Sequence, residues 1–263
     1  MPIKTASQLA RRLEALVERW AQALPAEQQP SFRHDFAGLG EEHEAALELI
    51  ERAWTRRERA YSFDETGLAR RRPFYDHLVG LLSVLGQSSV VGVLFVDVDG
   101  LKSINDRFGH LVGDQAVRVI GTLLRESLRV DRDRPDVLAR TAETDDYSVS
   151  HYGGDEFVAA LELKAADDIL GVVKRLRDRV NDPSAQRHRG FDAGIRLSAS
   201  IGAVVNAPAD GAPHAGPALA RTLVMIADEQ MYASKRDGRV HVAFAAWAGD
   251  RSLDRERTRT MVV

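Results

Sequence analysis

The chain contains no cysteine, and this absence excludes several kinds of chemistry at once. Without thiols the protein has no disulfide bonds, no thiolate metal centre and no cysteine nucleophile. Any metal must therefore be bound by oxygen atoms or by imidazole nitrogens. A chain without cysteine also suits a reducing compartment, and we expect a cytoplasmic protein.

Long apolar runs and a strong net charge are also missing. No apolar run approaches the ~20 residues of a membrane-spanning helix, and the first residues show no apolar core of a signal peptide. The formal net charge is −3, so the chain lacks the broad basic field with which proteins neutralise nucleic-acid phosphates. We expect neither a membrane span nor a nucleic-acid partner.

The 263 residues are enough for one catalytic core and a smaller accessory region. Amphipathic patterns at residues 7–24 and about 41–60 predict an α-helical N-terminal region, bounded at 1–58. No metal or cofactor constellation is visible there, so we interpret this region as a dimerisation or signal-input element. A catalytic domain is expected over residues 59–246, and the mixed-charge residues 247–263 are expected to be a mobile tail.

The most informative stretch is residues 151–157, which read HYGGDEF. Two glycines and two carboxylates lie between short runs of β-forming residues, and this pattern predicts a tight hairpin with acids at its tip. Adjacent carboxylates at a turn can hold a divalent cation or accept a proton. On its own, however, the same pattern is also ordinary turn chemistry whose acids face water.

A second acidic cluster lies upstream, at the end of a predicted strand. Residues 90–96 form a continuous apolar run, long enough for a central strand that is buried on both faces. The run leads directly into residues 97–102, which read DVDGLK. A strand end fixes such carboxylates, and the following loop exposes backbone amides that can bind anions. The alternative interpretation is a solvated turn in which an aspartate caps the next helix.

The remaining elements are predicted from the spacing of apolar residues. Helices are expected near residues 74–85, 114–128, 165–180 and 218–234, and strands near 195–205 and 240–244. Residues 182–192 are predicted to form a polar loop.

Several motifs agree in order and spacing with the GGDEF family, the diguanylate cyclases, and the chain resembles this family from Phe63 to Phe244. Besides the two acidic clusters, the matching residues are Thr66-Gly67-Leu68 with Arg71 and Phe74; Asn105, Asp106, Gly109, His110, Gly113 and Asp114; Ser200-Ile201-Gly202; and Ala227-Asp228 with Met231-Tyr232, Lys235 and Gly238-Arg239. The resemblance implies an α+β fold, with a central β-sheet flanked by helices and related to the palm of nucleotide cyclases and polymerases. It also implies condensation of two GTP molecules into cyclic di-GMP with release of pyrophosphate.

The resemblance also implies roles for individual residues at the reacting centre. Asp97, Asp155 and the carbonyl of Val98 would hold Mg²⁺, or Mn²⁺ in its place. Glu156 would deprotonate or orient the 3′-hydroxyl that attacks the α-phosphate. Cations that stabilise both the attacking and the leaving oxygens are what phosphoryl transfer of this kind requires.

Substrate contacts are implied at two further places. The loop that contains Leu101 and Lys102 would cradle the β- and γ-phosphates through backbone N–H groups. Lys235 and Arg239 resemble the family's additional phosphate contacts, and Asn105 and Asp114 match the positions that read guanine. In isolation, each of these residues would more often be a solvated surface charge or a helix cap.

The chain departs from the family pattern in two places near the hairpin. The Arg-x-x-Asp motif with which the family often binds its product corresponds to Thr144 and Tyr147, so we expect no product inhibition through that site. The arginine that usually stands two residues before the hairpin glycines is His151 in this chain.

Three functional interpretations follow from these patterns. The leading one is an active homodimeric cyclase, because each active site binds one GTP and two must meet across a two-fold axis; receptors for cyclic di-GMP would act downstream. The second is a catalytically silent GGDEF module that binds GTP or a partner protein as a regulator, although such modules typically lose the hairpin acids. The third is an interaction protein whose function lies in the helical region.

Overall fold

The structure is a computed structural model of the whole chain, which describes Gln22 and residues 29–30, 63–85, 90–129, 148–191, 194–207, 216–248 and 252–263. The chain divides into two compact units, residues 1–61 and 62–263. The predicted N-terminal helices fall almost wholly outside the described residues, as do Thr144 and Tyr147. Within the described residues, no helix combines the length and the apolar character needed to cross a membrane.

A six-stranded mixed sheet forms the centre of the second unit, with the strand order β2-β3-β1-β4-β5-β6. Strand β1 is antiparallel to both β3 and β4, whereas β5 is parallel to β4 and antiparallel to β6. The strands are β1 (Val90–Val98), β2 (Val149–Gly153), β3 (Glu156–Leu163), β4 (Ala199–Asn206), β5 (His241–Phe244) and β6 (Arg259–Val262).

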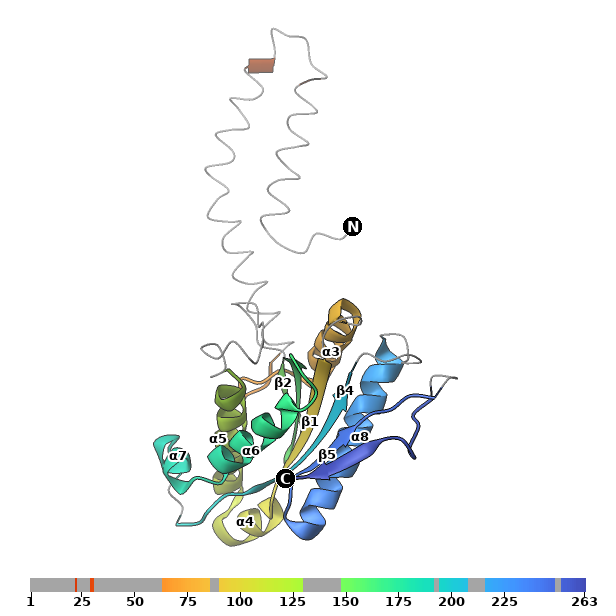
Figure 1. Cartoon of the computed structure of the whole chain (residues 1–263). Helices are drawn as coiled ribbons and strands as arrows, with labels where there is room; N and C mark the ends of the chain where they lie inside the picture. Colours follow the sequence, from red (N-terminus) through yellow and green to blue (C-terminus); the bar gives the residue numbers. More distant parts are fainter. Residues whose placement is uncertain are drawn as a thin grey trace. The chain divides into compact units, whose positions relative to one another are not determined.

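Helices cover both faces of this sheet. One apolar cluster packs α5 and α6 against one face, and a second packs α3 and α8 against the other (Figure 1). All nine residues of β1 are buried between the two clusters, which explains the continuous apolar run predicted for a central strand. The helices are α3 (Arg71–Leu85), α4 (Leu101–Phe108), α5 (His110–Arg129), α6 (Asp168–Val180), α7 (Pro183–His188) and α8 (Pro217–Asp237).

Helix α8 approaches strand β4 so closely that a side chain at Gly202 would collide with its backbone. A Cβ atom at Gly202 would lie 1.9 Å from the amide nitrogen of Met231 and 2.4 Å from the carbonyl oxygen of Ala227. The missing side chain therefore lets the C-terminal half of α8 rest directly on the sheet. This half of the helix carries Lys235.

The end of the chain does not form the mobile tail that we expected for residues 247–263. Strand β6 instead extends the sheet by pairing with β5. Trp247 is buried, and its indole donates a hydrogen bond to Oδ1 of Asn206 at 2.9 Å. The mixed charge of this segment led to the wrong prediction because its charged side chains form ion pairs within the fold. Arg255, for example, forms a bidentate ion pair with Glu229 at 3.0 and 3.2 Å.

Residues 182–192 were predicted to be a loop, but they contain the short helix α7. Asp182 caps this helix by accepting a hydrogen bond from the backbone of Ser184 at 2.9 Å, and a proline follows the cap. Gln186 is buried, and its amide donates to the carbonyls of Val180 and Leu197 at 2.7 and 2.8 Å. A polar sequence can therefore form a packed element when its polar groups are satisfied internally.

Candidate active site

Strands β2 and β3 form the predicted hairpin, with Gly154 and Asp155 at its tip. Gly154 has φ 61°, a left-handed conformation that favours glycine. The carbonyl of Asp155 accepts a hydrogen bond from the amide of Val98 at 3.0 Å, and Glu156 pairs with Asp97 across the two strands. The hairpin tip is thus joined to the end of β1, and the two acidic clusters of the sequence become one.

The carboxylates of this cluster differ in burial and repel one another. Asp97 is 4% exposed, whereas Asp155 and Glu156 are half-buried. Burial raises the pKa of Asp97, the negative charges of Asp155 and Asp99 raise it further, and Lys235 opposes the rise. Burial likewise raises the pKa of Glu156, followed by repulsion from Asp97, Asp228 and Asp155. A cation placed among these groups would relieve the repulsion.

Lys235 supplies a positive charge that partly offsets the negative charge of this cluster. Its Nζ lies 2.7 Å from Oδ1 of Asp97, and apart from this ion pair Oδ1 makes no hydrogen bond to the described part of the chain. Burial alone would lower the pKa of Lys235, but the hydrogen bond and charge of Asp97, with the charges of Asp155 and Asp99, raise it overall. The ammonium group is therefore positively charged at neutral pH.

Asp99 has a structural role that the sequence did not reveal. Its two carboxylate oxygens accept hydrogen bonds from the hydroxyl groups of Ser198 and Ser200, each at 2.7 Å. These bonds tie the loop after β1 to the start of β4. The prediction of a strand near residue 200 gave no indication of this pairing, because it depends on the register of β1 against β4.

The oxygen donors at this site fit a hard divalent cation. Asp97 and Asp155 offer carboxylate oxygens, and Val98 offers its carbonyl at the end of β1, which are the ligand types that Mg²⁺ prefers. Among the described residues, no three His, Asp or Glu side chains gather into a metal-binding group of their own. A cation bound here would therefore complete its coordination with the Val98 carbonyl and with oxygens from water or a ligand.

The predicted phosphate loop lies directly after Asp97 and Val98, two of the predicted metal ligands. Gly100 turns the chain with φ 68°, and α4 begins at Leu101 without a side chain that caps its N-terminus. The first amides of a helix have no partners within the helix and attract anions. Lys102 is exposed in this first turn.

Asn105 and Asp114 lie on the two helices that follow, α4 and α5, which pack against each other. Oδ1 of Asn105 is buried and has no hydrogen-bond partner in the described residues. The Asn105 side chain lies so close to Gly113 that a Cβ atom there would be 1.8 Å from Oδ1. Asp114, the next residue, is exposed. A buried amide oxygen without a partner is uncommon in proteins and is consistent with a ligand-binding position.

Arg239 is a predicted site residue for which the described part of the chain shows no side-chain contact with the acidic cluster. It follows Gly238, which ends α8 with φ 71°. Its amide donates to Oδ1 of Asp237 at 2.9 Å, and its carbonyl accepts a hydrogen bond from Ser234. Among the described residues, its exposed guanidinium forms no ion pair with the acids of the site.

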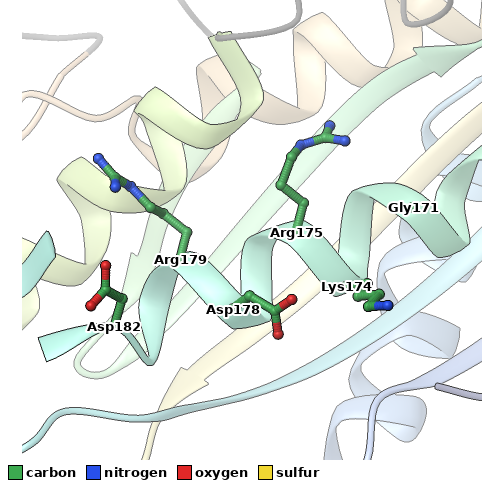
Figure 2. Close-up of a pocket in the computed structure, with 6 residues that line it drawn as sticks. All are labelled: Gly171, Lys174, Arg175, Asp178, Arg179 and Asp182. Atoms are coloured by element: carbon green, nitrogen blue, oxygen red, sulfur yellow. The ribbon is translucent and has the colours of Figure 1, made fainter. Parts of the chain in front are cut away.

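An open depression of about 550 Å³ lies elsewhere, along the outer side of α6. Figure 2 shows that its side chains come from α6 and from the turn that follows this helix. Both basic and acidic side chains line the depression, and none of the predicted site residues is among them. The lining residues are Gly171, Lys174, Arg175, Asp178, Arg179 and Asp182.

The mixed sheet, the helices on both of its faces and the acidic hairpin beside the central strand define a palm-like α+β domain. The chain belongs to the GGDEF family, because the model described as "Diguanylate cyclase, GGDEF domain" matches residues 63–241.

Individual relatives agree with this assignment. The chain is 35% identical over 152 residues to "Diguanylate cyclase DosC" of Escherichia coli (strain K12), a match that covers 58% of this chain and 28% of DosC. It is 30% identical over 179 residues to "Response regulator PleD" of Caulobacter vibrioides (strain NA1000 / CB15N), covering 66% of this chain and 34% of PleD. The matches therefore span only about a third of these relatives.

A solved structure shows the same fold. The GGDEF domain of DgcB from Caulobacter crescentus, determined in complex with c-di-GMP, superposes with a TM-score of 0.53 at 23% identity. The superposition covers 71% of this chain and 96% of that domain. The expected central β-sheet flanked by helices is thus confirmed.

Proposed function

We propose that this protein is a diguanylate cyclase that condenses two GTP molecules into cyclic di-GMP and releases pyrophosphate. The observation that carries the proposal is the meeting of Asp97, Asp155 and Glu156 at the junction of β1 and the hairpin, beside Lys235. The diguanylate cyclases among the relatives support the same reaction. The presence of both hairpin acids favours an active enzyme over a silent module that only binds GTP or a partner.

The acidic residues have distinct roles in this proposal. Asp97, Asp155 and the Val98 carbonyl would hold Mg²⁺ or Mn²⁺, which when bound stabilises negative charge on the reacting phosphate. Glu156 would accept the proton of the attacking 3′-hydroxyl or orient that hydroxyl. Its raised pKa, caused by burial and by neighbouring acids, makes its carboxylate a stronger proton acceptor than an ordinary glutamate.

The remaining site residues would bind GTP. Lys235 and Arg239 would contact the terminal phosphates. The lysine ammonium would act as a compact positive charge, and the arginine guanidinium would donate parallel hydrogen bonds. The amides of Leu101 and Lys102 would bind the same phosphates at the start of α4. Asn105 and Asp114 would read guanine, because a carboxylate accepts hydrogen bonds from N1–H and the exocyclic amine, a pattern that adenine does not offer.

Two copies of the chain would be needed to bring two GTP molecules together, so we expect a homodimer that acts in the cytoplasm. The N-terminal residues 1–58 would set the dimer geometry or receive the input signal. The product would act through separate cyclic di-GMP receptors.

The test is incubation of the purified full chain with GTP and Mg²⁺, followed by separation of the nucleotides by chromatography and mass spectrometry. Wild type and the control Asp178→Ala, changed on the exposed side of α6, should produce cyclic di-GMP, whereas Asp155→Ala should produce none. GTP binding without product, at protein concentrations that give a dimer, would contradict the proposal and support the regulatory module.

A further inference from the structure

His151 lies on β2 between two groups that can only accept hydrogen bonds. Its Nδ1 is 2.6 Å from the carboxylate oxygen Oδ2 of Asp64, and its Nε2 is 3.0 Å from the carbonyl oxygen of Gly154. The pair with Asp64 is well shielded, because the two side chains are 19% and 14% exposed. The ring also stacks on Phe157, with centroids 5.2 Å apart.

This arrangement determines the protonation state that satisfies both contacts. A neutral imidazole has one N–H donor and one acceptor nitrogen, so it can serve only one of two acceptors. The imidazolium carries two N–H donors and serves both. Asp64 remains an acceptor, because hydrogen bonds from Thr66 and His151 outweigh burial and lower the pKa of its carboxyl group.

We propose that His151 is a positioning residue that acts as an imidazolium and holds the tip of the catalytic hairpin to the turn at residues 63–70. The inference rests on the proposed cyclase function, because it concerns the geometry of that same site. His151 does not itself touch the reacting groups in this proposal. It acts through Gly154, the residue before Asp155.

The turn that receives His151 is itself held firmly. Oδ1 of Asp64 accepts a hydrogen bond from the amide of Thr66 at 2.9 Å, and the backbone of His151 donates to the carbonyl of Ala69 at 3.2 Å. This turn begins just after the boundary between the two units, at residues 61 and 62. A displacement of the turn would therefore reach β2 through these backbone bonds and the hairpin tip through the His151 side chain.

Charged side chains on the elements that pack against β2 can also affect the protonation of the ring. On the turn and on the elements that pack against β2, these side chains include Glu65 and Arg70 on the turn, Arg71 at the start of α3, Arg125 on α5, and Asp155 and Glu156 at the hairpin. Arg70 donates to the carbonyl of Phe63, and Arg125 donates to that of Gly67. Asp64 is the charged group that contacts the ring.

An arginine at this position would be charged at every pH at which proteins fold, whereas a histidine is charged only while it keeps its second proton. When His151 loses that proton, one of its two hydrogen bonds must be lost. The hairpin is therefore anchored fully at lower pH, and the anchor weakens as the pH rises. Cyclase activity should decrease on the alkaline side for this reason.

The first test does not depend on catalysis. The full chain, labelled with ¹⁵N in its eight histidines, would be examined by NMR over a range of pH, with the His151→Arg variant identifying the signal of His151. We expect both ring nitrogens to carry protons at neutral pH. A single neutral tautomer at neutral pH would overturn the inference.

The second test compares pH profiles of kcat and KM for GTP in four proteins. His151→Gln should lower kcat by roughly tenfold, the effect expected from losing a hydrogen bond between charged groups, with little change in KM. His151→Arg should keep the activity and remove the alkaline decrease. The control His188→Gln, changed at an exposed position on α7, should behave as wild type.

The two tests separate the two proposals. If none of the four proteins, wild type included, forms cyclic di-GMP, the proposed function is wrong. The NMR measurement would still determine the protonation of His151. If wild type is active but His151→Arg is as impaired as His151→Gln, the charge does not position the hairpin and the inference is wrong.

Discussion

At the scale of single residues, Asp97 and Lys235 show how a buried carboxylate is stabilised at this site. Asp97 is buried among other acids, and a lone carboxylate in such a place would be costly. Lys235 reaches it from the last turn of α8. An ammonium group on a flexible stem can leave this position when a stronger cation or a phosphate arrives. In the proposed function, the same lysine would therefore serve both the acids and a bound triphosphate.

Glu156 gives a prediction about pH at this scale. Its pKa is raised in the folded protein, above the ordinary value of 4.5, so the folded state holds the proton more tightly than the unfolded state. The charged carboxylate therefore costs stability above the raised pKa, and this cost disappears as the pH falls toward the ordinary value. Glu156→Gln should stabilise the fold at neutral pH, by less than about 1 kcal/mol because the group is partly solvated, and should abolish activity.

The measurement is thermal unfolding of wild type and Glu156→Gln across a range of acidic to neutral pH. The difference in stability should be largest at neutral pH and should vanish in acid. A difference that is constant with pH would mean that the charge of Glu156 is not its source.

At the scale of secondary-structure elements, the contact between β4 and α8 makes the most direct prediction. Gly202→Ala places a methyl group 1.9 Å from a backbone nitrogen of α8, so the helix must move away from the sheet. Overpacking of this kind costs about 1–3 kcal/mol. Because α8 also carries Lys235, cyclase activity should decrease as well. Denaturant unfolding and the cyclase assay measure the two effects.

Gly171→Ala on α6 is the matched control for this substitution. Apart from the neighbouring residues and backbone of its own helix, a Cβ atom at Gly171 would meet no atom within 4 Å. Alanine also has a higher helix propensity than glycine, by about 1 kcal/mol, so this variant should be as stable as wild type or more stable. Equal destabilisation by both substitutions would refute the role assigned to the contact at Gly202.

The elements also show what the sequence can predict. The central strand and the hairpin were predicted because each depends on a local pattern, an apolar run for β1 and a Gly-Gly turn for the hairpin. The ion pair of Lys235 with Asp97 and the two serine bonds to Asp99 join distant segments. No local pattern encodes the register that creates them. Helix α7 was missed because its sequence is polar and its stability comes from a cap and a buried glutamine.

At the scale of the whole molecule, the C-terminal segment closes one edge of the sheet. Its charges were interpreted as a sign of mobility, but Arg255 and Trp247 hold it in place. Removal of residues 247–263 should expose the edge of β5 and lower the thermal stability. An uncovered strand edge also favours aggregation, so light scattering should increase on heating.

Arg255→Ala serves as the control for this deletion, because a surface ion pair contributes at most about 1 kcal/mol. It should leave the melting temperature and the scattering nearly unchanged. A truncated protein that melts and scatters like wild type would show that β6 is dispensable.

The close contact at Gly202 also affects how genetic data on this protein should be interpreted. In a screen of random substitutions for loss of signalling, changes at Gly202 would be recovered together with changes at Asp97 and Glu156. Gly202 offers no functional group to a nucleotide, yet it pairs with Phe95, two residues from Asp97 on the central strand. A map of sensitive positions would then include both the acidic site and the packing contact that supports it. Only a separate measurement of folding would tell the two apart.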